Sequence, residues 1–294
     1  MIRIFLLVIL IFAFQVKSKE TLDVVVLYDK STINNVPELN STFKRNEKSK
    51  EFIRSLKQSF NNSELGSHYD FRLKASILKD FVNITNKVNP SPTDLSNIYS
   101  SYIRLSVQNG NKPFGTLQNI QKTYNADIVL SVFPHTLGVL NTGVCGASPT
   151  PMKNNFFLNN VSELLKIGPY GISFINADSY CMKKDYLIAH EVGHGFGLKH
   201  GLAIDGEVSF NSYKDEMIDY ASGIGYNDKN SLLYRGTIMA QPGFSDTIHN
   251  RFSDISVDKC GVCKNKPCGN GYSSAITPLI KYKSDYNKRG DWYK

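Results

Sequence analysis

Residues able to do chemistry are concentrated in one short stretch of this 294-residue chain. Half of its six histidines lie in the sequence His190-Glu-Val-Gly-His194-Gly-Phe-Gly197-Leu-Lys-His200. On an α-helix His190 and His194 are one turn apart and project from the same side, so both imidazoles can reach one cation. Glu191 lies about 100° around the helix from His190 and can face a water on that cation without ligating it. The stretch therefore predicts a metal site with a carboxylate base beside it.

His200 can join this site only if the helix stops early. On a continued helix His200 would lie about 9 Å along the axis from His194, too far to share one ion with it. A left-handed backbone at Gly197 would end the helix and bring His200 back toward the metal. Three histidines with an open fourth position are typical of a catalytic zinc. The alternative is a buried helix with hydrogen-bonded histidines, and Gly197 and His200 at these offsets argue against it.

The surrounding elements are expected to form an α/β fold. Apolar runs and alternation predict strands, and 3.6-residue spacing predicts helices, in the order strand, helix, strand, helices, strand. This order predicts a twisted, mostly parallel sheet covered by helices. The strands are expected at 23–28, 71–77, 128–133 and 172–175, with an edge strand at 143–147, and the helices at 43–60, 92–105 and 116–124.

Two helix caps and a second subdomain are also predicted. Thr116 is expected to cap the helix at 116–124, and Asp185 the helix that carries the histidines. After His200 the chain is rich in Gly, Asp, Asn and Ser and shows little periodicity. We therefore expect an N-terminal catalytic subdomain at 19–198 and a smaller, irregular C-terminal subdomain at 199–259.

The first residues have the form of a secretory signal peptide. A short positive start at Met1 to Arg3 precedes an apolar run at 4–16, which is well short of the roughly 20 residues that a bilayer core requires. We expect cleavage near Ser18, so that residues 1–18 are removed. The mature chain is then expected to be secreted and extracellular, without a transmembrane segment.

The five cysteines are expected to form disulfides, because exported proteins meet an oxidising compartment. Two pairs, for example Cys145 with Cys181 and two of the remaining three, leave one odd thiol. The last three have the spacing C-x2-C-x4-C, which resembles a zinc knuckle, but a fourth ligand is missing. These last three are Cys260, Cys263 and Cys268.

The charge pattern excludes one class of partner and marks one segment. A formal net charge of +8 is too small to imply nucleic-acid binding. Residues 260–294 form a Cys-containing basic tail, in which basic and aromatic residues alternate from Lys281 onward. A solvated tail is the simpler interpretation, and a patch that contacts a cell surface or docks a substrate is the alternative.

The histidine motif resembles the signature of the metzincin zinc peptidases, HExxHxxGxxH followed by a methionine turn. The candidate turn is Gly236-Thr-Ile-Met239, and the resemblance makes Met239 a hydrophobic floor beneath the histidines rather than a ligand. Within this family the chain is most similar to the adamalysin or reprolysin group, in the segments Ile238-Met239-Ala-Gln-Pro242-Gly243 and Arg251-Phe252-Ser253-Asp254. In that group the Pro lines the primed side of the cleft, and the Phe-Ser stretch opens the last helix.

Two residues depart from the patterns of related groups. Gly201 follows the third histidine, where adamalysins carry Asp, and this weakens the assignment to that subgroup. Gln241 lies two residues beyond Met239, so the extra tyrosine ligand of astacins and serralysins is not expected.

The resemblance implies a secreted zinc endopeptidase with one Zn²⁺ per chain. His190, His194 and His200 would be the ligands and Glu191 the general base, with protein or peptide substrates lying along the edge strand at 143–147. One alternative is a zinc-containing adhesion or toxin module that does not cut, against which the intact Glu191 argues. Another is a zinc hydrolase that acts on a small amide.

Overall fold

The computed structural model describes most of the chain that surrounds the motif. The signal peptide, the helix at 92–105, Pro242, Cys260 and Cys263 fall among the predictions that lie outside the described residues. The described residues are 18–30, 36–80, 113–133, 145–151, 161–166, 168–177, 179–201, 203–204, 207–208, 223–228, 233–240, 247–258, 267–269 and 273–293.

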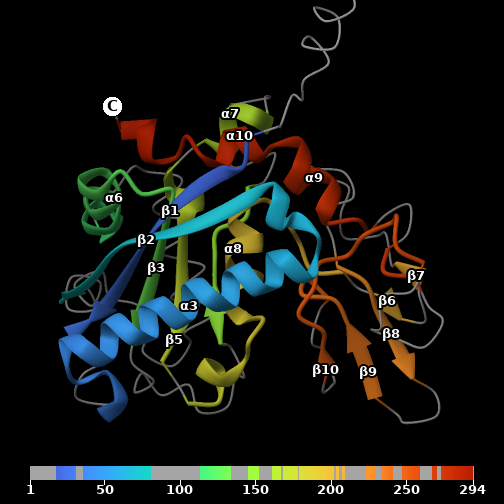
Figure 1. The fold of residues 1–294 in the computed structure, drawn as a ribbon, viewed down its shortest axis with the longest axis horizontal. Helices are drawn as coiled ribbons and strands as arrows, with labels where there is room; N and C mark the ends of the chain where they lie inside the picture. Colours follow the sequence, from blue (N-terminus) through green and yellow to red (C-terminus); the bar gives the residue numbers. More distant parts are fainter. Residues whose placement is uncertain are drawn as a thin grey trace, which may run out of the picture.

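A five-stranded sheet with strand order β2-β1-β3-β5-β4 lies at the centre of the fold (Figure 1). Its parallel strands are β1 (Glu20–Asp29), β2 (Tyr69–Lys79), β3 (Ile128–Phe133) and β5 (Ile172–Asn176). β4 (Gly146–Ala147) pairs antiparallel with β5 at one edge. The predicted mixed α/β fold with a mostly parallel sheet is confirmed, including the position of the edge strand.

Helices cover both faces of this sheet. α3 (Thr42–Asn62) and α8 (Leu187–Gly195) pack on one face, and α6 (Pro113–Tyr124) packs on the other (Figure 1). α7 (Val161–Leu165) is a shorter helix that lies beside the C-terminal segment of the chain (Figure 1). The 3-10 helices lie at Pro37–Leu39, Leu65–Ser67, Gly168–Gly171, Cys181–Lys183 and Gly290–Tyr293.

The unbroken apolar run of β1 follows from this two-sided burial. Val24, Val26 and Tyr28 pack on the face that α3 and α8 cover, whereas Val25 and Leu27 pack on the face of α6. All five are fully buried. A parallel strand buried on both faces has no polar side, which explains why the sequence shows a continuous apolar run rather than an alternation.

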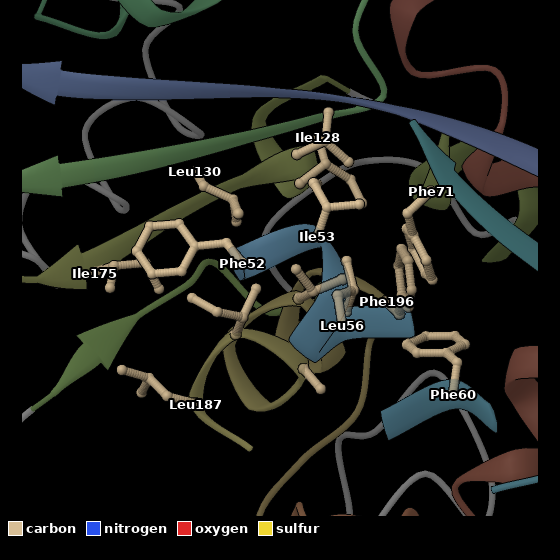
Figure 2. Packing of buried hydrophobic residues seen from close by; sticks show 14 of the residues in the cluster. Phe52, Ile53, Leu56, Phe60, Phe71, Ile128, Leu130, Ile175, Leu187 and Phe196 are labelled. Atoms are coloured by element: carbon tan, nitrogen blue, oxygen red, sulfur yellow. The ribbon is translucent and has the colours of Figure 1, made fainter. Parts of the chain in front are cut away.

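The apolar stripe of α3 packs into the larger of the two core clusters. Phe52, Ile53, Leu56 and Phe60 recur at helical spacing and pack against strand residues such as Leu130 (Figure 2). Ser41 caps the start of the helix, because its side chain accepts a hydrogen bond from the main-chain N–H of Lys44. The predicted helix at 43–60 is confirmed. Its buried side chains belong to the same core cluster as those of α8.

Both predicted helix caps are wrong. α6 begins at Pro113 rather than Thr116, since proline lacks an N–H and its fixed φ suits the first turn. α8 follows Tyr186, which makes no side-chain cap bond. Asp185 instead accepts a hydrogen bond from Asn250 Nδ2 at 3.3 Å. A contact with a residue 65 positions away therefore replaces the local cap.

The region after His200 contains more regular structure than its sequence suggests. β8 (Gly225–Asp228), β9 (Leu233–Gly236) and β10 (Thr247–Ile248) form one small sheet, and β6 (Ala203–Ile204) pairs with β7 (Glu207–Val208). These strands are two to four residues long, too short for a hydrophobic period to be visible.

The last helices do not begin where the resemblance placed them. Phe252 and Ser253 are not helical, and α9 (Ile276–Lys281) and α10 (Lys283–Tyr286) come later. Ser253 still reaches the start of α9, because its Oγ accepts a hydrogen bond from the main-chain N–H of Ala275 at 2.8 Å. This stretch therefore contacts the last helices through residues that are 22 positions apart in the sequence.

The prediction of a solvated C-terminal tail is wrong for residues 276–290. Leu279 and Tyr286 are fully buried, and Arg289 is only 1% exposed. This segment runs across the top of the sheet in Figure 1. Lys281 and Lys288 are exposed, and contact of the basic tail with a cell surface stays a prediction.

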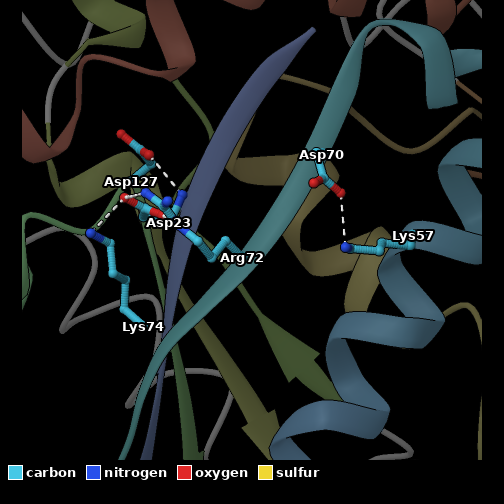
Figure 3. Close-up of polar contacts among 6 residues, drawn as sticks. All are labelled: Asp23, Lys57, Asp70, Arg72, Lys74 and Asp127. Carbon is cyan, nitrogen blue, oxygen red and sulfur yellow. Dashed lines mark hydrogen bonds and ion pairs between the residues drawn. The ribbon is translucent and has the colours of Figure 1, made fainter.

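Ion pairs fasten the outer strand β2 to its neighbours (Figure 3). Asp23 on β1 accepts two hydrogen bonds from Arg72, at 2.6 and 2.9 Å, and pairs with Lys74 at 3.0 Å. Burial by itself raises the pKa of Asp23, but the two cations outweigh it and the pKa is lowered. Asp70 pairs with Lys57 of α3 at 2.8 Å. The basic side chains of these pairs are at least partly exposed, so the pairs contribute little to the stability of the fold.

The buried carboxyl of Asp127 should make the stability of the protein depend on pH. Its carboxylate accepts main-chain bonds from Asp23 at 2.8 Å and Gly290 at 3.4 Å, and burial raises its pKa from 3.8 to about 6. The native state then binds this proton more tightly than the unfolded chain, so stability falls as pH rises from about 4 to 6. The loss attributable to this group is about 3 kcal/mol. Denaturant titrations at pH 4 and pH 7 measure the unfolding free energy, and Asp127→Asn should lose less stability between these pH values than the wild type. An identical pH dependence in both proteins would contradict the role of Asp127.

A disulfide links the edge strand to the segment that precedes α8. Cys145 and Cys181 are bonded, which confirms the example pairing. Cys268 is also disulfide-bonded, so it is not a ligand of a structural zinc. These bonds fit an oxidising compartment. In the described part of the chain, no helix has both the length and the apolar character needed to cross a bilayer.

Removing the Cys145–Cys181 bond should destabilise the protein by about 3–4 kcal/mol, as expected for a closed loop of 36 residues. The double variant Cys145→Ser, Cys181→Ser isolates this bond, because a reductant would also open the disulfide of Cys268. Chemical denaturation under oxidising conditions measures the change. Equal unfolding free energies for variant and wild type would show that the bond does not constrain the unfolded chain.

Candidate metal centre

The structure brings the three predicted histidines together. His190 and His194 project from the same side of α8, and His200 returns to them after the helix ends. His200 Nε2 lies 3.0 Å from His190 Nε2 and 3.1 Å from His194 Nε2. The candidate ligand atoms of the three residues all lie within 4.8 Å of one another.

Main-chain carbonyls orient two of these rings. The Nδ1 of His190 lies 2.7 Å from the carbonyl oxygen of Ile238, and the Nδ1 of His194 lies 2.9 Å from that of Leu198. A carbonyl only accepts, so each Nδ1 must carry the proton and donate it. The Nε2 of both rings is then left with a lone pair that points toward His200.

This arrangement fits a metal ion. Burial lowers the pKa of all three imidazoles, and that of His190 falls to about 3. Neutral rings that turn lone pairs toward a common point repel one another unless a cation lies between them. Three nitrogens on a tetrahedral ion at about 2.0–2.1 Å are about 3.3 Å apart, close to the separations seen here. The cluster can therefore hold a metal ion.

The turn that returns His200 forms as the sequence predicts. Gly197 has φ +86°, in the left-handed region. The N–H of Gly197 donates to the carbonyl of His194 at 2.8 Å, and the N–H of Leu198 donates to that of Gly193 at 2.9 Å. This pair of bonds is a Schellman motif, which ends a helix and reverses the chain.

A side chain at Gly197 should weaken this turn. Gly197→Ala is expected to lower the unfolding free energy by about 1–2 kcal/mol, because a Cβ is disfavoured at positive φ. Gly197→Asn is the matched control, since Asn tolerates this conformation and should lose less. Urea denaturation of the metal-free proteins measures both changes. Equal stability of the wild-type and Ala proteins would contradict the argument.

Met239 lies beneath α8. It is fully buried, and its Sδ would be 2.8 Å from a Cβ placed on Gly193, in the last turn of the helix. The turn that holds it is closed by a bond from the N–H of Ala240 to the carbonyl of Thr237 at 2.9 Å. Because the neighbouring carbonyl of Ile238 bonds to His190, the same turn also orients a candidate ligand.

The departure at Gly201 has a steric reason. A Cβ at this position would lie 1.7 Å from the carbonyl oxygen of Gly223. The N–H of Gly201 also donates to the carbonyl of Met239 at 2.9 Å, which fixes its backbone next to the turn. An Asp could not be accommodated without moving the segment that contains Gly223.

Glu191 is buried at the edge of the sheet, with 4% of its surface exposed. Ser148 Oγ donates to its Oε2 at 3.2 Å, and a Cβ on Gly146 of β4 would lie 2.6 Å from the carboxylate. Burial raises the pKa of Glu191 to about 8, although the bond from Ser148 favours the ionised form. A nearby divalent cation would lower this pKa toward neutrality. Such a carboxylate is suited to exchange protons near pH 7.

Sequence reasoning missed several groups around the cluster. The carbonyls of Ile238 and Leu198 carry no residue-type signal, because every residue has a carbonyl. Ser148 follows the predicted edge strand, but nothing local marks it as a partner of Glu191. Arg289 was visible within the basic, aromatic tail, yet its charge suggested the surface, whereas it donates to the carbonyl of Gly195 in α8.

Comparison of the sequence with protein-family models found no match, and comparison with curated proteins found none either. Solved structures do match in shape. One of them, described as the structure of a chaperone-substrate complex, is similar with a TM-score of 0.53 and 15% identity. The match covers 92% of this chain and 35% of that chain, so the present chain spans about a third of its length. At this identity the likeness concerns the fold alone.

Proposed function

We propose that this protein is a secreted zinc endopeptidase of the metzincin type, which hydrolyses peptide bonds in extracellular proteins. One observation carries the proposal: three imidazole nitrogens converge on one point, next to a helix-borne buried glutamate. The mostly parallel sheet with an antiparallel edge strand and the methionine buried under the helix support the same assignment.

His190, His194 and His200 would hold the ion and leave one position open. Imidazole suits several first-row metals, and three histidines with an open position are most typical of catalytic zinc. When bound, zinc lowers the pKa of water at the site toward about 7 and polarises a carbonyl oxygen.

Glu191 is the general base in this proposal. Its carboxylate takes the proton of the attacking water and passes it to the nitrogen of the leaving amine. Ser148 holds one carboxylate oxygen, so the other is available to the proton. Because Glu191 is buried, bulk water does not compete for its proton, and the same carboxyl can act first as base and then as acid.

The substrate is proposed to lie beside β4. A peptide in an extended conformation can add to an exposed sheet edge through main-chain hydrogen bonds. At this edge Ser148 bonds to the Glu191 carboxylate, and the backbone of Gly146 passes so close that a Cβ there would collide with it. A chain bound at this edge would therefore place its carbonyl groups near the general base. Pro242, the candidate for the primed side, remains a prediction.

Within the metzincins, we propose that the chain is most similar to the adamalysin group. The buried methionine turn belongs to the signature of all metzincins and does not distinguish this group. Gly201 and the non-helical Phe252–Ser253 stretch differ from the group's pattern. Secretion is supported by the signal-like N-terminus and the disulfides.

Incubation with casein and with a peptide library tests the function. We expect fragments in the mass spectrum that disappear with 1,10-phenanthroline and return when Zn²⁺ is restored. Stoichiometric zinc without any cleavage would instead favour the adhesion or toxin module. Hydrolysis of small amides but not of peptides would favour the non-peptidase hydrolase.

A further inference from the structure

The carbonyls at the end of α8 have two kinds of partner. The Schellman bonds use those of Gly193 and His194. The next two carbonyls bond to side chains from the C-terminal segment, about 90 residues further along the chain. Arg289 Nη2 donates to the carbonyl of Gly195, and Tyr286 Oη donates to that of Phe196 at 3.0 Å.

Arg289 is an unusual residue for this position. It is only 1% exposed, and its Nε donates to the carbonyl of Leu165 at 2.8 Å. Its guanidinium carbon lies 5.4 Å from the ring centroid of Phe196 and 5.3 Å from that of Tyr286. The two rings are themselves stacked at 4.3 Å.

A buried guanidinium is costly unless its donors are satisfied and its charge is stabilised. The negative end of the α8 dipole and the faces of two aromatic rings stabilise this charge. Burial lowers the pKa of Arg289 to about 10, with Tyr286 and Asp127 opposing the shift, so the side chain stays charged at neutral pH. An apolar side chain would fill the same space without this desolvation cost, so packing alone does not explain an arginine.

Arg289 and Tyr286 bond to the turn that determines the orientation of His194 and the position of His200. The turn at 195–198 includes Gly197, with its positive φ, and Leu198, whose carbonyl accepts the bond from His194 Nδ1. His200 follows two residues later. A shift of this turn would therefore change both the orientation of His194 and the position of His200.

We propose that Arg289 and Tyr286 are positioning residues of the metal centre, which hold the turn after α8 and thereby the geometry of His194 and His200. This inference rests on the proposed metal site but not on peptidase activity. Partners that orient ligands typically change metal affinity 10- to 100-fold when lost.

Metal affinity of the full chain tests the proposal. The variants are Tyr286→Phe, which removes one hydroxyl, Arg289→Met, and Arg289→Lys, which keeps the charge but not the planar fork. Ser162→Ala is the matched control, because it removes a bond of 2.7 Å to Asp285 in the same C-terminal segment without touching the turn. The zinc Kd is measured by chelator competition, and the visible spectrum of the Co²⁺-loaded protein reports ligand geometry.

We expect the zinc Kd to rise about 10-fold for Tyr286→Phe and toward 100-fold for Arg289→Met, with Arg289→Lys between them. The cobalt spectrum should shift in the same order, and Ser162→Ala should match wild type in both measurements. A purely structural role would lower the thermal midpoint and leave Kd and spectrum unchanged in the folded protein. That result overturns the proposal.

Tyr286→Phe decides alone if Arg289→Met does not fold, because loss of one hydroxyl preserves the ring packing. An unchanged zinc Kd and cobalt spectrum in this variant then overturn the proposal. Wild-type protein that binds zinc but cleaves no peptide would remove the proposed activity, whereas the affinity series would still test the positioning role.

Discussion

Glu191→Gln is expected to retain zinc and to lose nearly all peptide cleavage. Gln has almost the same shape and can still accept the bond from Ser148, but it cannot take a proton from water. General-base contributions are about 10²- to 10⁴-fold, so kcat/KM should fall by at least that range. Because the buried carboxylate is replaced by a neutral group, the fold and the three histidines should be preserved.

Three measurements make this prediction decisive. Atomic absorption gives the zinc content, circular dichroism reports the fold, and a fluorogenic peptide gives kcat/KM. Glu163→Gln on α7 is the control, because the Glu163 side chain is 54% exposed and it should leave cleavage unchanged. Wild-type cleavage by the Glu191 variant would remove this residue from the mechanism, even if the protein remained a zinc peptidase.

His200→Ala is expected to have the second largest effect, on the metal itself. Loss of one of three ligands should weaken zinc binding by more than about 100-fold, the upper end for loss of a group that only orients a ligand. Cleavage at limiting zinc should fall in parallel. The metal-free fold should persist, because His200 is only partly buried and the close contacts of its Nε2, at 3.0 and 3.1 Å, are to the two other histidines of the cluster.

Added imidazole provides a specific check. If the Ala variant leaves a hole where the ring lay, free imidazole should restore part of the zinc affinity, as measured by chelator competition. His249→Ala is the control, since His249 lies outside the histidine cluster and the change should leave the zinc Kd unaltered. Full retention of zinc by His200→Ala would show that His200 is not a ligand.

The fold class was accessible from local patterns. Continuous apolar runs and 3.6-residue spacing are visible within short stretches of sequence. The sequence therefore predicts β1, α3, β3 and β5 close to their observed positions. The short strands after His200 are too short to show a hydrophobic period. α6 begins at a proline, and the residue expected to cap α8 bonds instead to Asn250, far away in the sequence. The burial of Arg289 could not be predicted, because its partners are carbonyls and rings far away in the chain.

The same division holds for the candidate site. Spacing on a helix places His190, His194 and Glu191, and a glycine at the helix end allows His200 to return; these are local consequences of backbone geometry. Tertiary packing alone decides which carbonyls orient the rings, which hydroxyl reaches Glu191, which cysteines pair, and which residues hold the turn. Every residue has a carbonyl, so only the folded chain selects the few that act.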